Sequence, residues 1–130
     1  MITLKASDAA DVQQVVRAHE AILPRGGGSK RALSTATEAK VCLDLSQLSG
    51  IIEYQPSEYT FTAYAGTPVQ AVKDELAKHA QYMPFDPILT QQGATLGGTV
   101  AANTSGSGRY RYGGVRDFIL GIQFVDGQGQ

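Results

Sequence analysis

Two glycine-rich stretches contain the residue types best suited to binding an anion through the backbone. The first glycine loop, residues 24–30, reads Pro-Arg-Gly-Gly-Gly-Ser-Lys, and the second glycine stretch, residues 92–114, holds seven of the chain's 15 glycines. Glycines let a ligand approach the main chain closely, and successive N–H groups in such a turn form a concave site for phosphate oxygens. The Ser29 hydroxyl is a further donor, and Arg25 or Lys30 adds positive charge. A plain glycine turn is the alternative for the first loop, and a flexible linker for the second stretch.

Neither stretch fits the two best-known phosphate-binding loops. Residues 28–31, Gly-Ser-Lys-Arg, lack the spacing and the second glycine of the P-loop. Residues 26–28 and 93–98 do not reproduce the Gly-x-Gly-x-x-Gly spacing of a Rossmann dinucleotide unit. No metal site is expected either, because the chain has a single cysteine and its two histidines lack neighbours at metal-ligand spacing.

The composition restricts the class of protein. A chain of 130 residues with 42% hydrophobic and 18% charged residues is long enough for one globular domain. A net charge of -1 gives no basic surface for a nucleic-acid partner. No apolar run approaches the roughly 20 residues that span a bilayer, and the N-terminus does not resemble a signal peptide. The sequence therefore predicts a cytoplasmic protein without a membrane span.

The rest of the chain predicts the elements that position the two stretches. Apolar patterns indicate strands at Met1–Leu4, Ile22–Pro24, Val41–Leu45, Ile51–Tyr54, Tyr59–Ala65 and Phe118–Val125. One helix is expected to begin at Ser7, with the apolar positions Val12, Val15, Val16 and Ile22. A second is expected at Thr67, with Pro68 as first residue, Gln70 completing a capping box and a buried stripe of Val69, Val72, Leu76 and Ala80.

Two shorter patterns complete the expected fold. Leu96, Val100, Ala101 and Ala102 predict the buried side of one short helical turn, and the alternation over 109–112, Arg-Tyr-Arg-Tyr, predicts a solvated edge with one tyrosine face packed. The order of elements predicts an α+β fold of two lobes. Each lobe contributes one glycine-rich loop, and the two loops would face a single elongated ligand.

The motifs of the two stretches also occur together in a known family. They read Pro24-Arg25-Gly26-Gly27-Gly28-Ser29, then Asp86-Pro87, Ala94-Thr95-Leu96-Gly97-Gly98, Asn103-Thr104-Ser105-Gly106, Tyr112-Gly113 and Asp117-Phe118-Ile119-Leu120-Gly121. With these motifs the chain resembles the FAD-binding domain of the vanillyl-alcohol oxidase and p-cresol methylhydroxylase (PCMH) superfamily. Residues 113–121 look most like the FAD-binding subunits of bacterial glycolate oxidases.

The resemblance implies which residues hold FAD. Backbone N–H groups of the first loop would bind the pyrophosphate from one side, and the second stretch would line the other side and the flavin edge. Family members that bind flavin covalently through the first loop have histidine where this chain has Ser29, so non-covalent FAD is expected. The implied cofactor-binding residues are Arg25, Gly26, Gly27, Gly28, Ser29, Pro87, Gly93, Ala94, Thr95, Gly97, Gly98, Thr104, Ser105, Gly106 and Tyr112.

The resemblance also implies how much of the family architecture is present. Residues 1–130 are expected to form a partial FAD-binding domain of the PCMH type, truncated at the C-terminus, with lobe one at about 1–48 and lobe two at about 49–130. A substrate or cap domain, which handles the substrate in the family, is not expected within these residues. The unfinished sheet would leave an open edge, which makes self-association an alternative.

The implied function is the FAD-binding portion of a flavin-dependent oxidoreductase that oxidises a small 2-hydroxy acid such as glycolate, with partner subunits of an oxidase complex. The isolated chain is expected to be inactive, and no residue in it is predicted to be catalytic. One alternative is a non-catalytic FAD- or nucleotide-binding or assembly module of a larger complex. Another is a superfamily member with a different substrate, since fold and cofactor do not fix the substrate.

Overall fold

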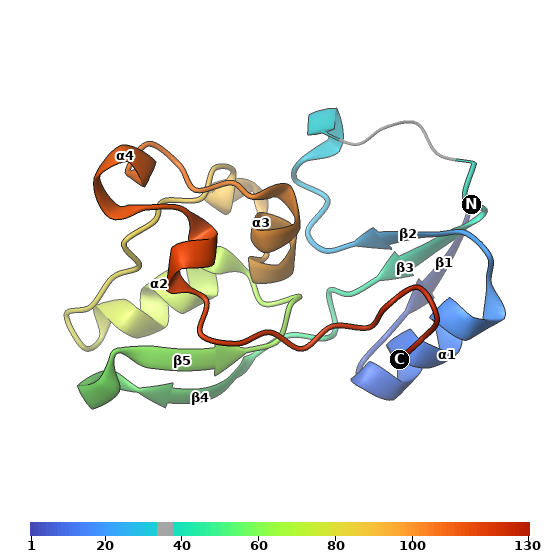
Figure 1. Ribbon diagram of the computed structural model, residues 1–130, viewed down its shortest axis with the longest axis horizontal. Helices are drawn as coiled ribbons and strands as arrows, with labels where there is room; N and C mark the ends of the chain where they lie inside the picture. The colour runs from blue at the N-terminus through green and yellow to red at the C-terminus, as the bar shows by residue number, and fades with distance from the viewer. Residues whose placement is uncertain (34–37) are drawn as a thin grey trace.

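The computed structural model describes residues 1–33 and 38–130, which fold around two sheets (Figure 1). Helices and strands mix along the chain, as the α+β prediction requires. The strands are β1 (Ile2–Lys5), β2 (Ile22–Arg25), β3 (Val41–Asp44), β4 (Ile51–Gln55) and β5 (Thr60–Ala63). The helices are α1 (Ala9–Ala18), α2 (Val69–Ala77), α3 (Leu96–Ala102) and α4 (Arg109–Tyr112), with 3-10 turns η1 (Arg31–Leu33), η2 (Pro56–Glu58), η3 (Thr90–Gln92) and η4 (Val115–Phe118).

The first sheet is parallel, with strand order β1-β3-β2. Helix α1 makes the crossover between β1 and β2 that parallel strands require. Strand β3 lies in the middle, and its residues Val41, Cys42 and Leu43 are buried because neighbours cover them on both sides. Strand β2 ends at Arg25, so the chain passes from the sheet directly into the glycines of the first loop.

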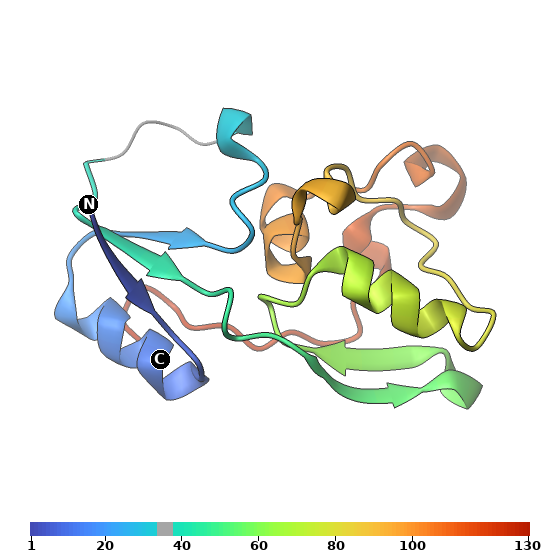
Figure 2. The same ribbon diagram turned by 180° about the vertical axis from the view of Figure 1, so that it is seen from behind.

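The second sheet is an antiparallel hairpin of β4 and β5, joined through η2. Helix α2 lies over this hairpin in both views (Figures 1 and 2). Its apolar stripe, Val69, Val72 and Leu76, forms a buried cluster with Met83 and Ala94. Ile51, Tyr54 and Phe61 of the hairpin pack against the cluster, so this core supports the second glycine stretch from below.

Both predicted helix starts are shifted by one residue. The cap of α1 is Asp8, not Ser7: the Asp8 carboxylate accepts from the Asp11 N–H at 2.8 Å, while the Ser7 hydroxyl donates to the Asp11 carboxylate. Aspartate and serine are equally good caps, so the sequence alone does not separate them. The helix ends at Ala18, and Ile22 belongs to β2 rather than to the helical stripe.

At α2 the cap is Pro68, and the predicted capping box is absent. The Thr67 hydroxyl donates instead to the Gly50 carbonyl at 3.1 Å and accepts from the Gly50 N–H, which ties the start of α2 to the start of the hairpin. The Gln70 side chain donates to Asp74. The helix also ends earlier than predicted, at Ala77, so Ala80 lies outside the buried stripe.

The strand predicted at Phe118–Val125 is wrong. Phe118 belongs to η4, and residues 119–125 form no strand with any described element. Alternating apolar residues make a strand only where a neighbour supplies backbone hydrogen bonds, and here Leu120, Ile122 and Phe124 stay exposed. The segment runs back to the first sheet, where Gln13 and Arg17 of α1 donate to the Gly129 carbonyl (Figure 1).

The predicted edge at 109–112 is also wrong, because these residues form the single helical turn α4, with Tyr110 fully exposed. The predicted short turn at Leu96 is confirmed as α3, although Ala101 faces solvent. Among the described residues, no helix has the length and apolar character needed to cross a membrane. The lobe boundary near residue 48 stays a prediction.

Replacing Leu76 with alanine tests the core that supports the second stretch. Leu76 is 5% exposed, so the variant should lower the free energy of unfolding by about 2–5 kcal/mol through lost burial and a residual cavity. Leu120→Ala is the matched control, because Leu120 is 87% exposed and the change should stay within about 0.5 kcal/mol. Equal losses in chemical denaturation would contradict the core described above.

Candidate functional site

The two glycine-rich stretches, more than 60 residues apart in sequence, are in direct contact. A Cβ atom at Gly27 would overlap the Gly93 carbonyl group, and a Cβ atom at Gly26 would overlap the Thr95 hydroxyl. In both views the loop that follows β2 lies beside α3 (Figures 1 and 2). We call this contact of residues 26–30 with residues 93–98 the loop seam. Only residues without side chains permit so close an approach.

Two successive glycines at the start of α3 face opposite sides. Gly97 packs on Ala65: its N–H donates to the Ala65 carbonyl at 2.8 Å, and a Cβ atom would lie 2.8 Å from the Ala65 Cβ. Gly98 faces the loop seam, where a Cβ atom would lie 3.2 Å from the Thr95 hydroxyl and 4.0 Å from the Lys30 amine. Gly97 therefore serves internal packing, whereas Gly98 keeps the seam side of α3 free of side chains.

The two stretches differ in how many of their backbone N–H donors are hydrogen-bonded within the protein. On the α3 side, the N–H groups of Leu96, Gly97 and Gly98 donate to Thr67, Ala65 and the Thr95 hydroxyl respectively. In the first loop, by contrast, the N–H groups of residues 26–29 donate to no group in the described part of the chain. The Ser29 hydroxyl is likewise without a hydrogen bond to any described residue. The first loop therefore carries the free donors that an anion needs.

The charges beside the seam are also unequal. The Arg25 guanidinium pairs with Asp44 at 3.2 Å, on the neighbouring strand. Hydrogen bonds from the Ser46 N–H and hydroxyl, followed by the Arg25 charge, hold the pKa of the Asp44 carboxyl below its ordinary value of 3.8. The Lys30 ammonium is half-buried and has no ion pair or hydrogen bond within residues 1–33 and 38–130; burial lowers its pKa.

A second group of predicted residues lies at the other end of α3. The Asp86 N–H donates to the Ser105 carbonyl at 3.0 Å, and a Cβ atom at Gly106 would overlap the Asp86 carbonyl. The Ser105 hydroxyl accepts from the Val115 N–H at 3.1 Å. Pro87 is buried beside this junction. These contacts join three segments of the second stretch and its surroundings, so they hold α3 in place.

Two predicted residues do not line the loop seam: Ala94 lies inside the fold, and Tyr112 lies at a distance from the seam. Ala94 is fully buried, its N–H donates to Leu89, and its carbonyl accepts from Val69. Tyr112 belongs to α4, at the end of the molecule away from β2 (Figures 1 and 2). The structure thus brings together Gly26, Gly27, Gly28, Ser29, Gly93, Thr95 and Gly98, and it places Tyr112 elsewhere.

Two buried hydroxyls lack partners among the described residues, those of Thr99 and Thr104. Thr104 was predicted from the sequence. Thr99 was not, although it lies four residues after Thr95 and hence on the same side of α3. Buried polar atoms usually find a partner in the protein, an ordered water or a ligand. Both therefore leave hydrogen-bonding capacity beside the predicted site.

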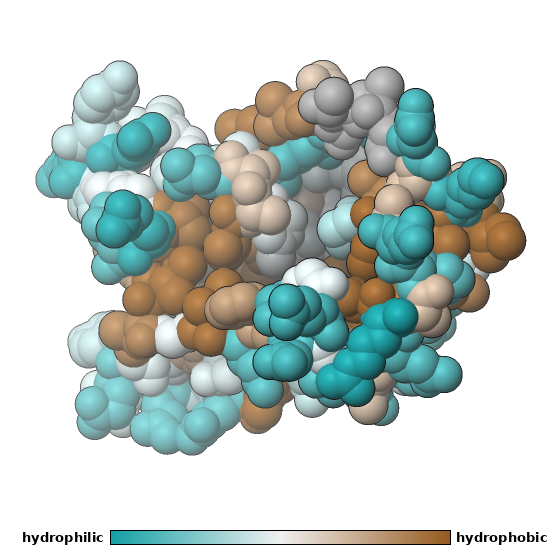
Figure 3. All heavy atoms as spheres, turned by 45° about the vertical axis from the view of Figure 1, so that its right-hand side comes forward, coloured by the Kyte–Doolittle hydropathy of each residue, from teal (hydrophilic) through white to brown (hydrophobic). Residues whose placement is uncertain are grey.

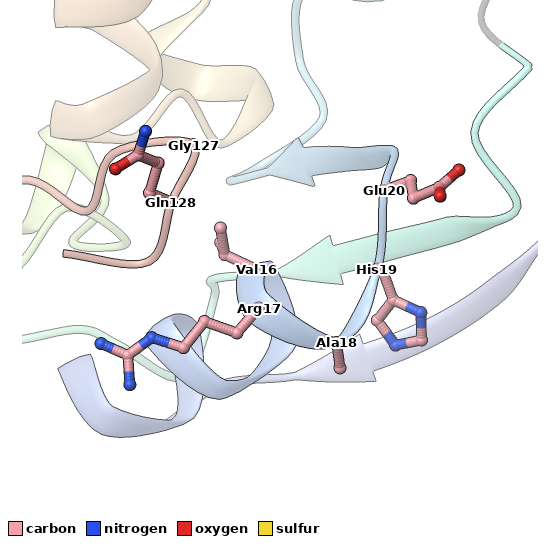
Figure 4. A pocket seen from close by; sticks show the side chains of 7 residues that line it. All are labelled: Val16, Arg17, Ala18, His19, Glu20, Gly127 and Gln128. Carbon is pink, nitrogen blue, oxygen red and sulfur yellow. The ribbon is translucent and has the colours of Figure 1, made fainter.

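Two hollows in the described part of the chain lie away from the loop seam. One, of about 420 Å³, is lined by Lys73, Phe85 and Tyr112 among others. Another, of about 360 Å³, lies between the C-terminal end of α1 and residues 127–128 (Figure 4). In Figure 3 the surface is also hollowed between the parts built on the two sheets, with apolar side chains on both flanks. The described residues contain no acidic, histidine or cysteine cluster that could hold a metal ion.

Comparison with known proteins identifies the family of the chain. Residues 2–130 match the family model of the FAD binding domain. The chain belongs to this family. The expected cofactor, FAD, and the expected PCMH-type fold are thereby confirmed. The seam fits this cofactor, since its free donors and unpaired ammonium suit a diphosphate and its glycines allow a close approach.

Relatives include the glycolate oxidase subunit GlcE of Escherichia coli K12, which is 33% identical over 119 residues, covering 92% of this chain and 34% of GlcE. A D-2-hydroxyglutarate dehydrogenase of Xanthomonas citri pv. viticola is 29% identical, covering 92% of this chain and 26% of the enzyme. Both confirm the predicted resemblance. The chain therefore spans about a third or less of the length of these relatives.

Two solved structures share the fold. A Phl p 4 variant, described as a glucose oxidase, superposes with a TM-score of 0.77 at 18% identity, covering 98% of this chain and 27% of that one. An alkyldihydroxyacetonephosphate synthase superposes with a TM-score of 0.74 at 22% identity, covering 91% and 25% respectively. At these identities the likeness establishes the fold alone.

Replacing Asp44 with asparagine tests the anchor of the first loop. The folded-state pKa of Asp44 is lowered, so its contribution to stability is complete above its ordinary value of 3.8 and is lost as the pH falls through the folded-state pKa. The variant should be less stable than the parent at about pH 6, and the difference should shrink below about pH 4. Urea denaturation at both pH values measures it. A pH-independent loss of stability in Asp44→Asn would contradict the assignment.

Proposed function

We propose that the chain is the FAD-binding portion of a flavin-dependent oxidoreductase that oxidises a small 2-hydroxy acid such as glycolate. The observation that carries the proposal is the loop seam, where Gly27 meets Gly93 and unpaired donors line one side. The names of relatives support the substrate class: a glycolate oxidase subunit, D-2-hydroxyglutarate dehydrogenases and a D-lactate dehydrogenase. Each name refers to a small 2-hydroxy acid.

The residues of this chain bind and orient the cofactor in this proposal. The free N–H groups of residues 26–29 and the Ser29 hydroxyl hold the diphosphate, and the side-chain-free face at Gly98 lets it approach α3. Bound FAD supplies the chemistry by accepting a hydride equivalent from the substrate. Ser29 stands where covalently flavinylated members of the superfamily have histidine, which supports non-covalent binding.

Substrate contacts and partner subunits belong, in this proposal, to the larger protein or complex. The chain covers only 34% of GlcE, itself named as a subunit. At the loop seam the described contacts involve backbone groups, the Thr95 hydroxyl and the Lys30 amine, and none of them involves a carboxylate or an imidazole. We therefore expect the chain to position FAD while other residues act on the substrate.

Replacing Gly98 with alanine separates FAD binding from folding. The parent should bind FAD saturably and gain thermal stability from it. A methyl group at Gly98 would lie 3.2 Å from the Thr95 hydroxyl, and this tight contact offsets the advantage of about 1 kcal/mol that alanine has over glycine in a helix, so without FAD the variant should unfold at about the parental temperature. Its FAD affinity should nevertheless fall at least about tenfold, or about 1.4 kcal/mol, because the methyl group occupies the seam.

Flavin fluorescence titration measures the affinity, and thermal unfolding of the free proteins measures the fold. The matched control is Gly121→Ala, where a Cβ atom would meet nothing within 4 Å and FAD affinity should be unchanged. If Gly98→Ala and Gly121→Ala bind FAD equally well, the cofactor does not lie on this face of α3.

Anaerobic reduction tests the substrate class. Glycolate, D-lactate or D-2-hydroxyglutarate should bleach the visible flavin absorbance of the protein or complex that contains this chain. The FAD-loaded chain by itself should keep its absorbance, because in this proposal the residues that act on the substrate lie in the rest of the protein or complex. If the complete assembly retains FAD but none of these acids bleaches it, the chain is a non-catalytic binding module or serves another substrate.

A further inference from the structure

The charged side chain of Lys30 reaches across the loop seam. Its amine lies 4.0 Å from the position that a Cβ atom at Gly98 would occupy, so it reaches from the first loop toward the start of α3. The ammonium is half-buried, and burial lowers its pKa. A partly desolvated cation is less stable than one in water unless an anion lies beside it.

The other cation of the first loop, Arg25, already has an anionic partner within the protein. Arg25 pairs with Asp44 at 3.2 Å, and Asp44 lies beside it in the register of β2 and β3. The guanidinium is thereby drawn toward the sheet. Lys30, in contrast, has no carboxylate partner among the described residues, which include every acidic residue of the chain.

The backbone of α3 cannot replace this charge. Its N–H groups at Leu96, Gly97 and Gly98 are each taken by an acceptor of the protein itself. An anion at the seam would thus find neutral amide donors on the first loop and the positive charge of Lys30. Charge-assisted hydrogen bonds are roughly twice as strong as neutral ones.

We propose that Lys30 binds the diphosphate of FAD directly, whereas Arg25, paired with Asp44, anchors the first loop to the sheet. The inference rests on the proposed binding of FAD at the loop seam. It assigns the electrostatic part of FAD affinity to one side chain, which sits where an incoming diphosphate neutralises it. FAD affinity should accordingly depend on salt through Lys30.

The test compares Lys30→Met with Lys78→Met, which removes the same charge from an exposed lysine of α2's C-terminal end. FAD is titrated at low and high salt. Lys30→Met should bind about tenfold more weakly at low salt and show a flatter salt dependence, whereas Lys78→Met should match the parent. Lys30→Arg should restore most of the affinity, since it keeps the charge.

Riboflavin, which lacks phosphate, separates charge recognition from structural damage. Lys30→Met should bind riboflavin no worse than the parent does. Parental FAD affinity and salt dependence in Lys30→Met would overturn the inference, and so would an equal loss for FAD and riboflavin, which would indicate a structural role. Failure of the parent itself to bind FAD would instead overturn the proposed function, and the inference with it.

Discussion

The contact between Gly27 and Gly93 is the constraint on which the site depends. A side chain at Gly27 would overlap the Gly93 carbonyl, so the loop that leaves the parallel sheet touches the loop that enters α3 through backbone alone. The two loops belong to parts of the chain with separate sheets. Since their approach fixes where donors and charges stand, the sheets and the core beneath α2 act chiefly to hold these two backbones together.

The two sides of the loop seam differ in whether their N–H groups are hydrogen-bonded within the protein. The α3 side satisfies its own N–H groups with Thr67, Ala65 and the Thr95 hydroxyl, which makes it a rigid wall. Residues 26–29 leave theirs unpaired among the described residues, which makes the first loop the side with donors available to an anion. Donors that are already oriented before a ligand arrives lose little entropy on binding, so this asymmetry suits tight non-covalent binding.

The sequence predicted those features that depend on composition and local pattern. Three consecutive glycines predict a loop wherever they occur, and the runs of apolar and β-branched residues in β1, β3, β4 and β5 predict strands from local pattern alone. The helix caps were displaced by one residue, since aspartate and serine are equally good caps and the Thr67 hydroxyl donates to the Gly50 carbonyl instead. Residues 118–125 alternate like a strand, but pairing depends on a partner that sequence pattern does not reveal.

The roles of Arg25 and Lys30 show the same limit at the site. Both are cations beside three glycines, and by sequence either could face an anion. The strand register distinguishes the two cations. Arg25 lies opposite Asp44, nineteen residues later, and forms an ion pair with its carboxylate. Lys30 lies beyond the turn, where the loop points it at Gly98 instead. A single ion pair between neighbouring strands thus determines which residue of the loop carries the free charge, and it does so without touching the ligand.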